Sequence, residues 1–313
     1  MPDTDLPFER IETNFSSNGV GCAATVFKPE SEDSTRPAIV MAHGFGSPRA
    51  VRLYAYAERF AAVGYVVVVF DYRGFGDSEG HPRQVLDIRM QHDDWRAALR
   101  FTRALSCVDS DAVVAWGTSF GGGHVITLAG LGEPLAALIA QVPHVSGLAA
   151  VRSTGVRASL RLAFPSIRDQ IAAWMRRTPV YVNSVGAPGE VAIMTTPDAL
   201  PGMHRLLDES ALQEGDYPKT VAARIVLKIG LYSPGRRAAA VACPALIQIA
   251  TDDAITPRLV AEAAATKMPL STVRTYAGGH FDPYVGELFE IVVADQIEFL
   301  NQHTPTAPSA QRN

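Results

Sequence analysis

The sequence predicts an α/β fold in which a mostly parallel β-sheet is flanked by helices. Short apolar segments bounded by glycines alternate with segments of helical spacing over residues 37–131, and again over residues 245–300. Such alternation implies parallel strands joined by right-handed helical crossovers. Glycine-rich segments follow three of the expected strands, at residues 43–46, 71–78 and 117–123. They should meet at the carboxyl edge of the sheet, where ligands bind in such folds.

The first half of the chain begins with a hairpin over residues 10–30, whose turn is Asn18-Gly19. An apolar run at 37–42 and a β-branched and aromatic run at 65–70 have the composition of buried strands. The remaining expected elements are a helix over 49–63 that ends before Gly64, a helix over 82–105 with Pro82 in its first turn, a strand over 112–116, and a helix from the 117–123 turn to Leu131.

Residues 145–235 break this rhythm and are expected to form a mainly helical lid, with an arginine-rich helix over 151–175. The α/β pattern then resumes with a strand at 245–250, a helix at 257–266, a strand at 272–276 and a final helix at 285–300. The sequence therefore divides into a first core part, a lid, a second core part and a disordered tail, at residues 1–144, 145–235, 236–303 and 304–313.

The composition is that of an ordinary globular protein. The chain has 313 residues, of which 47% are hydrophobic and 19% are charged. This is enough for one large core, or for one core plus a lid. The formal net charge of −4 provides no basic stripe for nucleic acid. Cys22, Cys107 and Cys243 lie far apart without metal-ligand or disulfide spacing, which favours a reducing compartment.

The chain shows no targeting or membrane signal. Residues 1–14 lack the basic and apolar regions of a signal peptide, and the longest apolar stretch, residues 61–70, is too short to span a bilayer. We expect a cytoplasmic protein that acts on a small molecule without metal or cofactor. Neither nucleic acid nor membrane is an expected partner, and a homodimer is an open possibility.

The segment Gly117-Thr118-Ser119-Phe120-Gly121 matches the pattern G-x-S-x-G. It lies between an expected strand and an expected helix, where a sharp turn can lift a serine hydroxyl clear of the sheet. The glycines flanking the turn relieve its crowding, and the helix dipole points at the site. A serine in this position becomes a nucleophile when a base takes its proton. Ser119 is therefore the candidate nucleophile.

The candidate base is His280. It follows an expected strand, and Gly278 and Gly279 before it allow a loop to carry the imidazole over the sheet edge. His43 is the rival, but it precedes a glycine-rich loop that it is expected to support through hydrogen bonds. His124 lies one turn past Ser119 and is expected to be a helix-face residue.

The candidate acid lies in the segment 251–257, after another expected strand. A buried carboxylate there would orient the imidazole and stabilise its charged form. Asp252 and Asp253 are adjacent and point in different directions, so only one can serve; we favour Asp253, and Asp252 stays the alternative. The oxyanion is expected to be held by the backbone N–H groups of Phe120 and Phe45.

Together these segments resemble the α/β-hydrolase superfamily. They are HGFG at 43–46, DYRGFGDSEG at 71–80, GTSFG at 117–121, DDAITP at 252–257 and GGHFD at 278–282. More narrowly, they are similar to bacterial hydrolases near the dienelactone-hydrolase and X-Pro-peptidase-like groups, and to the related fungal polyketide transferases. The resemblance covers residues 37–145 and 240–300.

This resemblance implies an eight-stranded, mostly parallel sheet and Ser-His-Asp catalysis without a metal. It also implies that Asp71 and Arg73 brace their loop as an ion pair. Phe75 and Phe281 are expected to line the substrate pocket. The fold alone does not define the substrate, because it hosts many chemistries.

The first functional hypothesis is hydrolysis of a carboxylic ester, lactone or thioester of a small hydrophobic substrate through an acyl-Ser119 intermediate. The alternative keeps this intermediate but passes the acyl group to an alcohol or amine, which makes the protein an acyltransferase. A third hypothesis, from another class, is a non-catalytic ligand-binding or receptor protein. Peptidase activity is disfavoured because no pocket for an N-terminal amine is recognisable.

Overall fold

The computed structural model describes residues 7–30 and 35–306. Its main sheet has eight strands among these residues, in the order β1-β2-β4-β3-β5-β6-β10-β11. The strands are β1 (Phe8–Ser17), β2 (Val20–Pro29), β3 (Arg36–Ala42), β4 (Val66–Phe70), β5 (Val108–Thr118), β6 (Ala137–Gln141), β10 (Ala245–Ala250) and β11 (Ser271–Tyr276). The hairpin β1-β2 is antiparallel and joins β4 antiparallel, whereas β3, β4, β5, β6, β10 and β11 pair in parallel. The predicted α/β architecture is confirmed.

Helices cover both faces of this sheet. They are α1 (Leu53–Ala62), α2 (Ile88–Arg103), α3 (Phe120–Ala129), α8 (Arg258–Ala265) and α9 (Gly286–His303). Strand β4 shows why its sequence is apolar throughout: Val66 and Val68 pack in the core with α2, α3 and α8, whereas Val67 and Val69 pack in the core with α1 and α9. Both faces of the strand are buried, so no alternation with polar residues remains.

The predicted start of the second helix at Pro82 is wrong, because α2 begins at Ile88. Gln84 has a positive φ of 56°, and its N–H donates to the carbonyl of Gly74, so the segment before α2 is a loop held against the loop that follows β4. Asp87 then caps the helix by accepting hydrogen bonds from the N–H groups of Arg89 and Met90.

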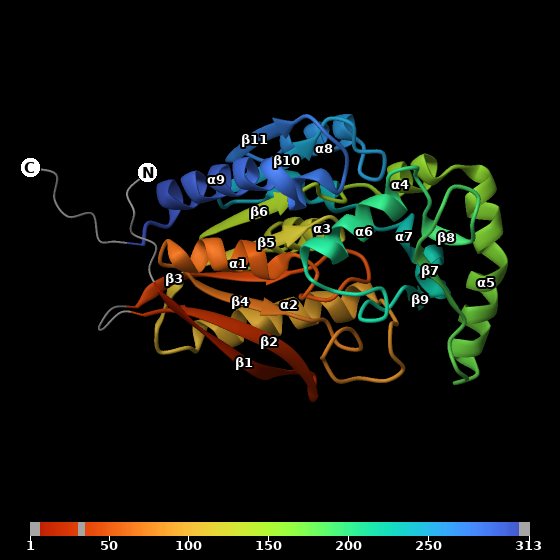
Figure 1. Ribbon diagram of the computed structural model, residues 1–313, viewed down its shortest axis with the longest axis horizontal. Coiled ribbons are helices and arrows are strands. Elements are labelled where there is room, and N and C mark those ends of the chain that lie inside the picture. The colour runs from red at the N-terminus through yellow and green to blue at the C-terminus, as the bar shows by residue number, and fades with distance from the viewer. Residues whose placement is uncertain (1–6, 31–34, 307–313) are drawn as a thin grey trace, which may run out of the picture.

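The chain between β6 and β10 forms an insertion, which occupies the right-hand part of the molecule in Figure 1, with α6 reaching toward the centre. Its elements are α4 (Gly147–Thr154), α5 (Val156–Trp174), β7 (Tyr181–Val185), β8 (Ala192–Met194), α6 (Ala199–Glu209), β9 (Thr220–Ala222) and α7 (Val226–Ile229). The expectation of a mainly helical segment missed a small sheet of order β8-β7-β9. Its strands have three to five residues, too few to show a period.

Other expectations concern the chain ends, the membrane and metals. The expected disordered tail lies largely outside the described residues, apart from 304–306. Within the described ranges, no helix has both the length and the apolar character needed to cross a bilayer. The same ranges contain no cluster of three or more His, Cys, Asp or Glu side chains suited to a metal ion. All three cysteines are free thiols.

Candidate active site

Ser119 occupies the sharp turn between β5 and α3. Its backbone has φ 53° and ψ −117°, a strained conformation that the surrounding contacts enforce. The N–H of Ser119 donates to the Gln141 carbonyl at 2.9 Å, and its own carbonyl accepts from the N–H of His144 at 2.8 Å. A Cβ on Gly121 would lie only 2.7 Å from the carbonyl oxygen of His43, so only glycine fits there.

His280 lies in the loop after β11 and is almost fully buried. Its Nε2 is 3.0 Å from the Ser119 hydroxyl oxygen, and its Nδ1 is 2.6 Å from Oδ2 of Asp253. A carboxylate can only accept, so Nδ1 carries the proton and Nε2 is left to accept the proton of Ser119. Side chains from three separate strand ends thus form one hydrogen-bonded series.

Asp253, rather than Asp252, contacts His280. Its Oδ1 accepts the N–H groups of Ile255 and Thr256 at 2.8 and 2.7 Å, and its Oδ2 also accepts the Thr256 hydroxyl. Burial alone would raise the pKa of the Asp253 carboxyl, but the His280 charge and these hydrogen bonds hold the pKa below its usual value. Asp252 is exposed, and its carboxylate accepts a hydrogen bond from the hydroxyl of Thr251 next to it.

The loop after β3 lies directly against the nucleophile. A Cβ on Gly44 would be 2.9 Å from Ser119 Cβ, so glycine allows the loop to approach. His43 stays in its own loop: its Nε2–H donates to the Val51 carbonyl at 2.9 Å, and its Nδ1 accepts the Gly44 N–H at 2.7 Å. Burial lowers the pKa of His43 to about 4, which keeps the ring neutral.

Phe45 and Phe120 flank Ser119, as expected of the two residues whose N–H groups should hold an oxyanion. Their rings meet edge to face with centroids 5.5 Å apart. Both residues border the same cavity as Ser119. The role expected of their backbone N–H groups belongs to the proposal below.

A cavity of about 560 Å³ opens beside Ser119, between the core and the insertion. Within the described part of the chain, no charged side chain lines it, and the lining residues are mostly aliphatic. They are Phe45, Ser119, Phe120, His144, Ala150, Val151, Ser153, Ser159, Leu162, Ala163, Ile193, Met194, Thr195, Thr196, Pro197, Val226, Leu227, Ile229, Ala254, Ile255 and Thr256. Such a lining suits an apolar ligand with few polar groups.

Neither of the two expected pocket residues, Phe75 and Phe281, is among the described residues that line this cavity. Phe75 is buried in the hydrophobic core on the α2 side and does not line the cavity, so its predicted position is wrong. Phe281 packs against Gly202 and borders a small hollow that also touches Ser119 and His280. The insertion instead supplies most of the cavity wall.

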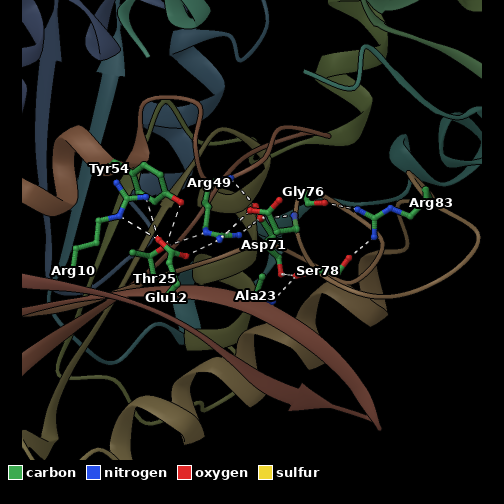
Figure 2. A network of polar contacts seen from close by, with 11 residues as sticks. Arg10, Glu12, Ala23, Thr25, Arg49, Tyr54, Asp71, Gly76, Ser78 and Arg83 are labelled. Atoms are coloured by element: carbon green, nitrogen blue, oxygen red, sulfur yellow. Dashed lines mark hydrogen bonds and ion pairs between the residues drawn. The ribbon is translucent and has the colours of Figure 1, made fainter. Parts of the chain in front are cut away.

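The expected ion pair between Asp71 and Arg73 is also wrong. Asp71 binds Arg49, whose guanidinium extends the network to Glu12 on β1, and Figure 2 shows this series. Arg73 pairs instead with Asp94 on α2. Both partners lie outside the loop motif, so the local sequence could not reveal them.

A second group of buried polar side chains lies behind α3 and was not predicted. His124 lies on α3, as expected, but is fully buried; its ring contacts the Tyr232 hydroxyl at 2.7 Å and Gln91 at 2.8 Å. His144, also buried, borders the cavity and stacks on Tyr232. The sequence offered one signal for His144. It follows β6, and the two strands beside β6 in the sheet, β5 and β10, are followed by Ser119 and Asp253.

This fold and this arrangement of side chains define an α/β hydrolase. The model of the X-Pro dipeptidyl-peptidase (S15) family matches residues 18–189, and the chain belongs to that family. The quorum-quenching protein AidA of Acinetobacter baumannii is 42% identical over 301 residues, which is 96% of this chain and 97% of that protein.

Solved structures show the same fold at lower identity. The α/β hydrolase GrgF of Penicillium superposes with a TM-score of 0.79 at 21% identity, covering 96% of this chain and 99% of that one. DcsB in complex with a substrate analogue gives a TM-score of 0.78 at 22% identity, covering 95% and 100% of the two chains.

Proposed function

We propose that this protein is a serine hydrolase that cleaves the ester, lactone or thioester bond of a small hydrophobic substrate through an acyl-Ser119 intermediate. The observation that carries the proposal is the hydrogen-bonded series Asp253–His280–Ser119, which ends at a cavity with no charged side chain among its described lining residues. Catalysis in this class depends on geometry of this kind.

In the proposed reaction, Nε2 of His280 takes the proton of Ser119 while the serine oxygen attacks the substrate carbonyl carbon. The negative charge that develops on the carbonyl oxygen is held by the N–H groups of Phe45 and Phe120. His280 then gives its proton to the leaving alcohol or thiol. Water repeats the cycle on the acyl-serine, releasing the acid, while Asp253 stabilises each imidazolium state.

The cavity lining supports an acyl substrate over a peptide. A peptidase that recognises a free N-terminus needs an anionic group for the ammonium, and none of the cavity-lining residues that the structure describes carries a carboxylate. The names of two fungal relatives, both thiohydrolases, support including thioesters among the substrates to test.

Acyl transfer is the second candidate, and one observation favours it. The polyketide transferase grgF of Penicillium is 25% identical across 97% of both chains. An apolar wall holds water poorly, which would allow an alcohol to compete for the acyl-enzyme. The two activities differ in one measurable ratio, the amounts of acid and of new ester formed when an alcohol is added.

The substrate proposal is tested with aryl esters, thioesters and lactones of increasing acyl length. Each methylene that enters the cavity should raise kcat/KM roughly fourfold, since burying one CH₂ is worth about 0.8 kcal/mol, until the cavity is filled. Ala163→Trp, which narrows the cavity, should lower activity on long chains more than on acetyl esters. The exposed Ala240→Trp is the control. Equal activity at all chain lengths would contradict the assignment of this cavity to the acyl group.

A further inference from the structure

Helix α5 turns an apolar face toward solvent. Leu160, Phe164, Ile167, Ile171 and Trp174 are 68, 74, 52, 45 and 76% exposed. The opposite face of the helix is buried and carries Leu162, Ser166 and Asp169, of which the last pairs with Arg224. A surface helix normally shows the reverse arrangement, with its apolar stripe toward the core.

This exposure is concentrated in the insertion. Of the 17 large hydrophobic side chains that are exposed among the described residues, 11 lie between Leu148 and Leu231, and five of these form the α5 stripe. Scattered exposed hydrophobics need no explanation, but a contiguous patch on a monomer rarely exceeds about 300–600 Å². With roughly 200 Å² for a whole side chain of this size, the stripe and the adjoining Met175 expose on the order of 700 Å².

The stripe is regularly spaced, and its end residues Leu160 and Trp174 each lie seven positions from Ile167. Its residues follow one another at intervals of four, three, four and three, the heptad spacing of helices that pack side by side. Ile167 is the midpoint. If two copies of α5 lie antiparallel, Ile167 meets its own copy, Leu160 meets Trp174, and Phe164 meets Ile171. Each pair brings together apolar side chains, as a two-fold interface requires.

We propose that a second copy of this chain covers the stripe, with the α5 helices antiparallel across a two-fold axis near Ile167. The exposed area approaches the ~800 Å² that each partner contributes to a standard stable interface. The described chain ends do not cover it: β1 and the end of α9 lie toward the opposite end of the molecule in Figure 1. The inner side of α5 lines the cavity through Ser159, Leu162 and Ala163, so this contact would also fix one cavity wall.

The charges beside the stripe allow an experiment to distinguish a second copy of the chain from a lipid surface as the partner. Arg161 and Arg168 lie along one edge of the stripe, and both are exposed. In the antiparallel dimer, Arg168 lies next to Arg168 of the second copy, where two like charges weaken the contact. On an anionic lipid surface the same arginine would strengthen binding. Removing its charge therefore has opposite effects for the two partners.

Sedimentation velocity of the full chain over a wide concentration range tests the dimer. Wild type should reach twice the 33.6 kDa chain mass, whereas Ile167→Asp should stay monomeric with an unchanged circular-dichroism melt. Leu259→Asp, at a site 75% exposed on α8, is the matched control and should remain dimeric. Arg168→Gln should lower the dimer dissociation constant severalfold.

Three results would overturn the proposal. They are a wild type that is monomeric at every concentration, an Ile167→Asp variant that dimerises like wild type, and binding to phosphatidylglycerol vesicles that weakens in Arg168→Gln while the protein in solution stays monomeric. The last result would assign the stripe to a lipid surface instead. None of these readouts depends on Ser119, so failure here is distinguishable from failure of the proposed hydrolase activity.

Discussion

Oδ2 of Asp253 lies 2.6 Å from Nδ1 of His280, although the carboxylate is buried and also accepts three hydrogen bonds from its own loop. The loop therefore fixes the carboxylate independently of the imidazole. Because the acceptor is fixed, it selects the tautomer of His280 in which Nε2 is bare and faces Ser119. The predictions below follow from this geometry and from the packing around it.

Asp253→Asn should reduce kcat by about 10⁴, because an amide N–H presented to Nδ1 favours the wrong tautomer of His280. Steady-state kinetics on an aryl ester measures the effect, and KM should change little. Asp252→Asn is the neighbouring control and should retain wild-type kcat, since its carboxylate is exposed and away from the imidazole. A larger loss in Asp252→Asn than in Asp253→Asn would reverse the assignment of the acid.

Gly44→Ala should lower kcat by about 10²–10³, the effect of losing one oxyanion donor, because the new methyl group would push the Phe45 loop away from Ser119. The fold should persist, as judged by thermal melting. Gly215→Ala, where a methyl group meets nothing within 4 Å, is the control. Full activity in Gly44→Ala would show that the loop does not need its close approach.

Three buried histidines should make the protein acid-sensitive. The pKa values of His43, His92 and His144 are each lowered to about 4, mainly by burial. Between pH 6.5 and 4 the unfolded chain binds protons that the folded chain does not, so stability falls as the pH falls through this window. Each histidine should contribute a slope on the order of 1 kcal/mol per pH unit.

Urea unfolding at pH 5 and pH 7 measures this slope. His92 does not line the cavity, so His92→Gln is a suitable variant. It should remove the contribution of this one histidine to the pH dependence of stability and leave the contributions of His43 and His144. A stability that does not change between these pH values would mean that the histidines protonate in the folded state without cost.

Arg49→Met should destabilise the fold by about 3–5 kcal/mol, because it leaves the buried Asp71 carboxylate without its cationic partner. Arg10→Met is the control, because its ion pair with Glu12 is exposed and should contribute less than about 1 kcal/mol. Chemical unfolding at pH 7 compares the two. A similar decrease in the free energy of unfolding in both variants would contradict this prediction. It would indicate that Asp71 pairs with another cation or becomes protonated.

Local physical causes underlie both the predicted fold and the choice of candidate site residues. The strand at Val66–Phe70 has no polar position because both faces are covered, and Ser119 sits between glycines because the turn admits no side chain there. His280 and Asp253 could be chosen because they follow parallel strands, whose carboxyl ends meet at one edge of the sheet.

The parts that failed depend on contacts between distant segments. Arg49 and Asp71 are 22 positions apart, so the motif around Asp71 suggested a nearer partner, Arg73. Phe75 follows a strand end and was expected to line the pocket. Its side chain instead packs in the hydrophobic core together with residues of α2. Pro82 is compatible with a helix start, but the positive φ of Gln84 and the cap at Asp87 place that start later.

The account as a whole depends on an activated Ser119, and the intact mass after treatment with a fluorophosphonate tests this most directly. Wild type should gain a single phosphonyl adduct, and Ser119→Ala should gain none. Labelling of Asp253→Asn should be slowed strongly, because the same base activates the serine. An unlabelled but folded wild type, or an adduct that persists in Ser119→Ala, would contradict the proposed catalytic series and would favour a ligand-binding protein over an enzyme.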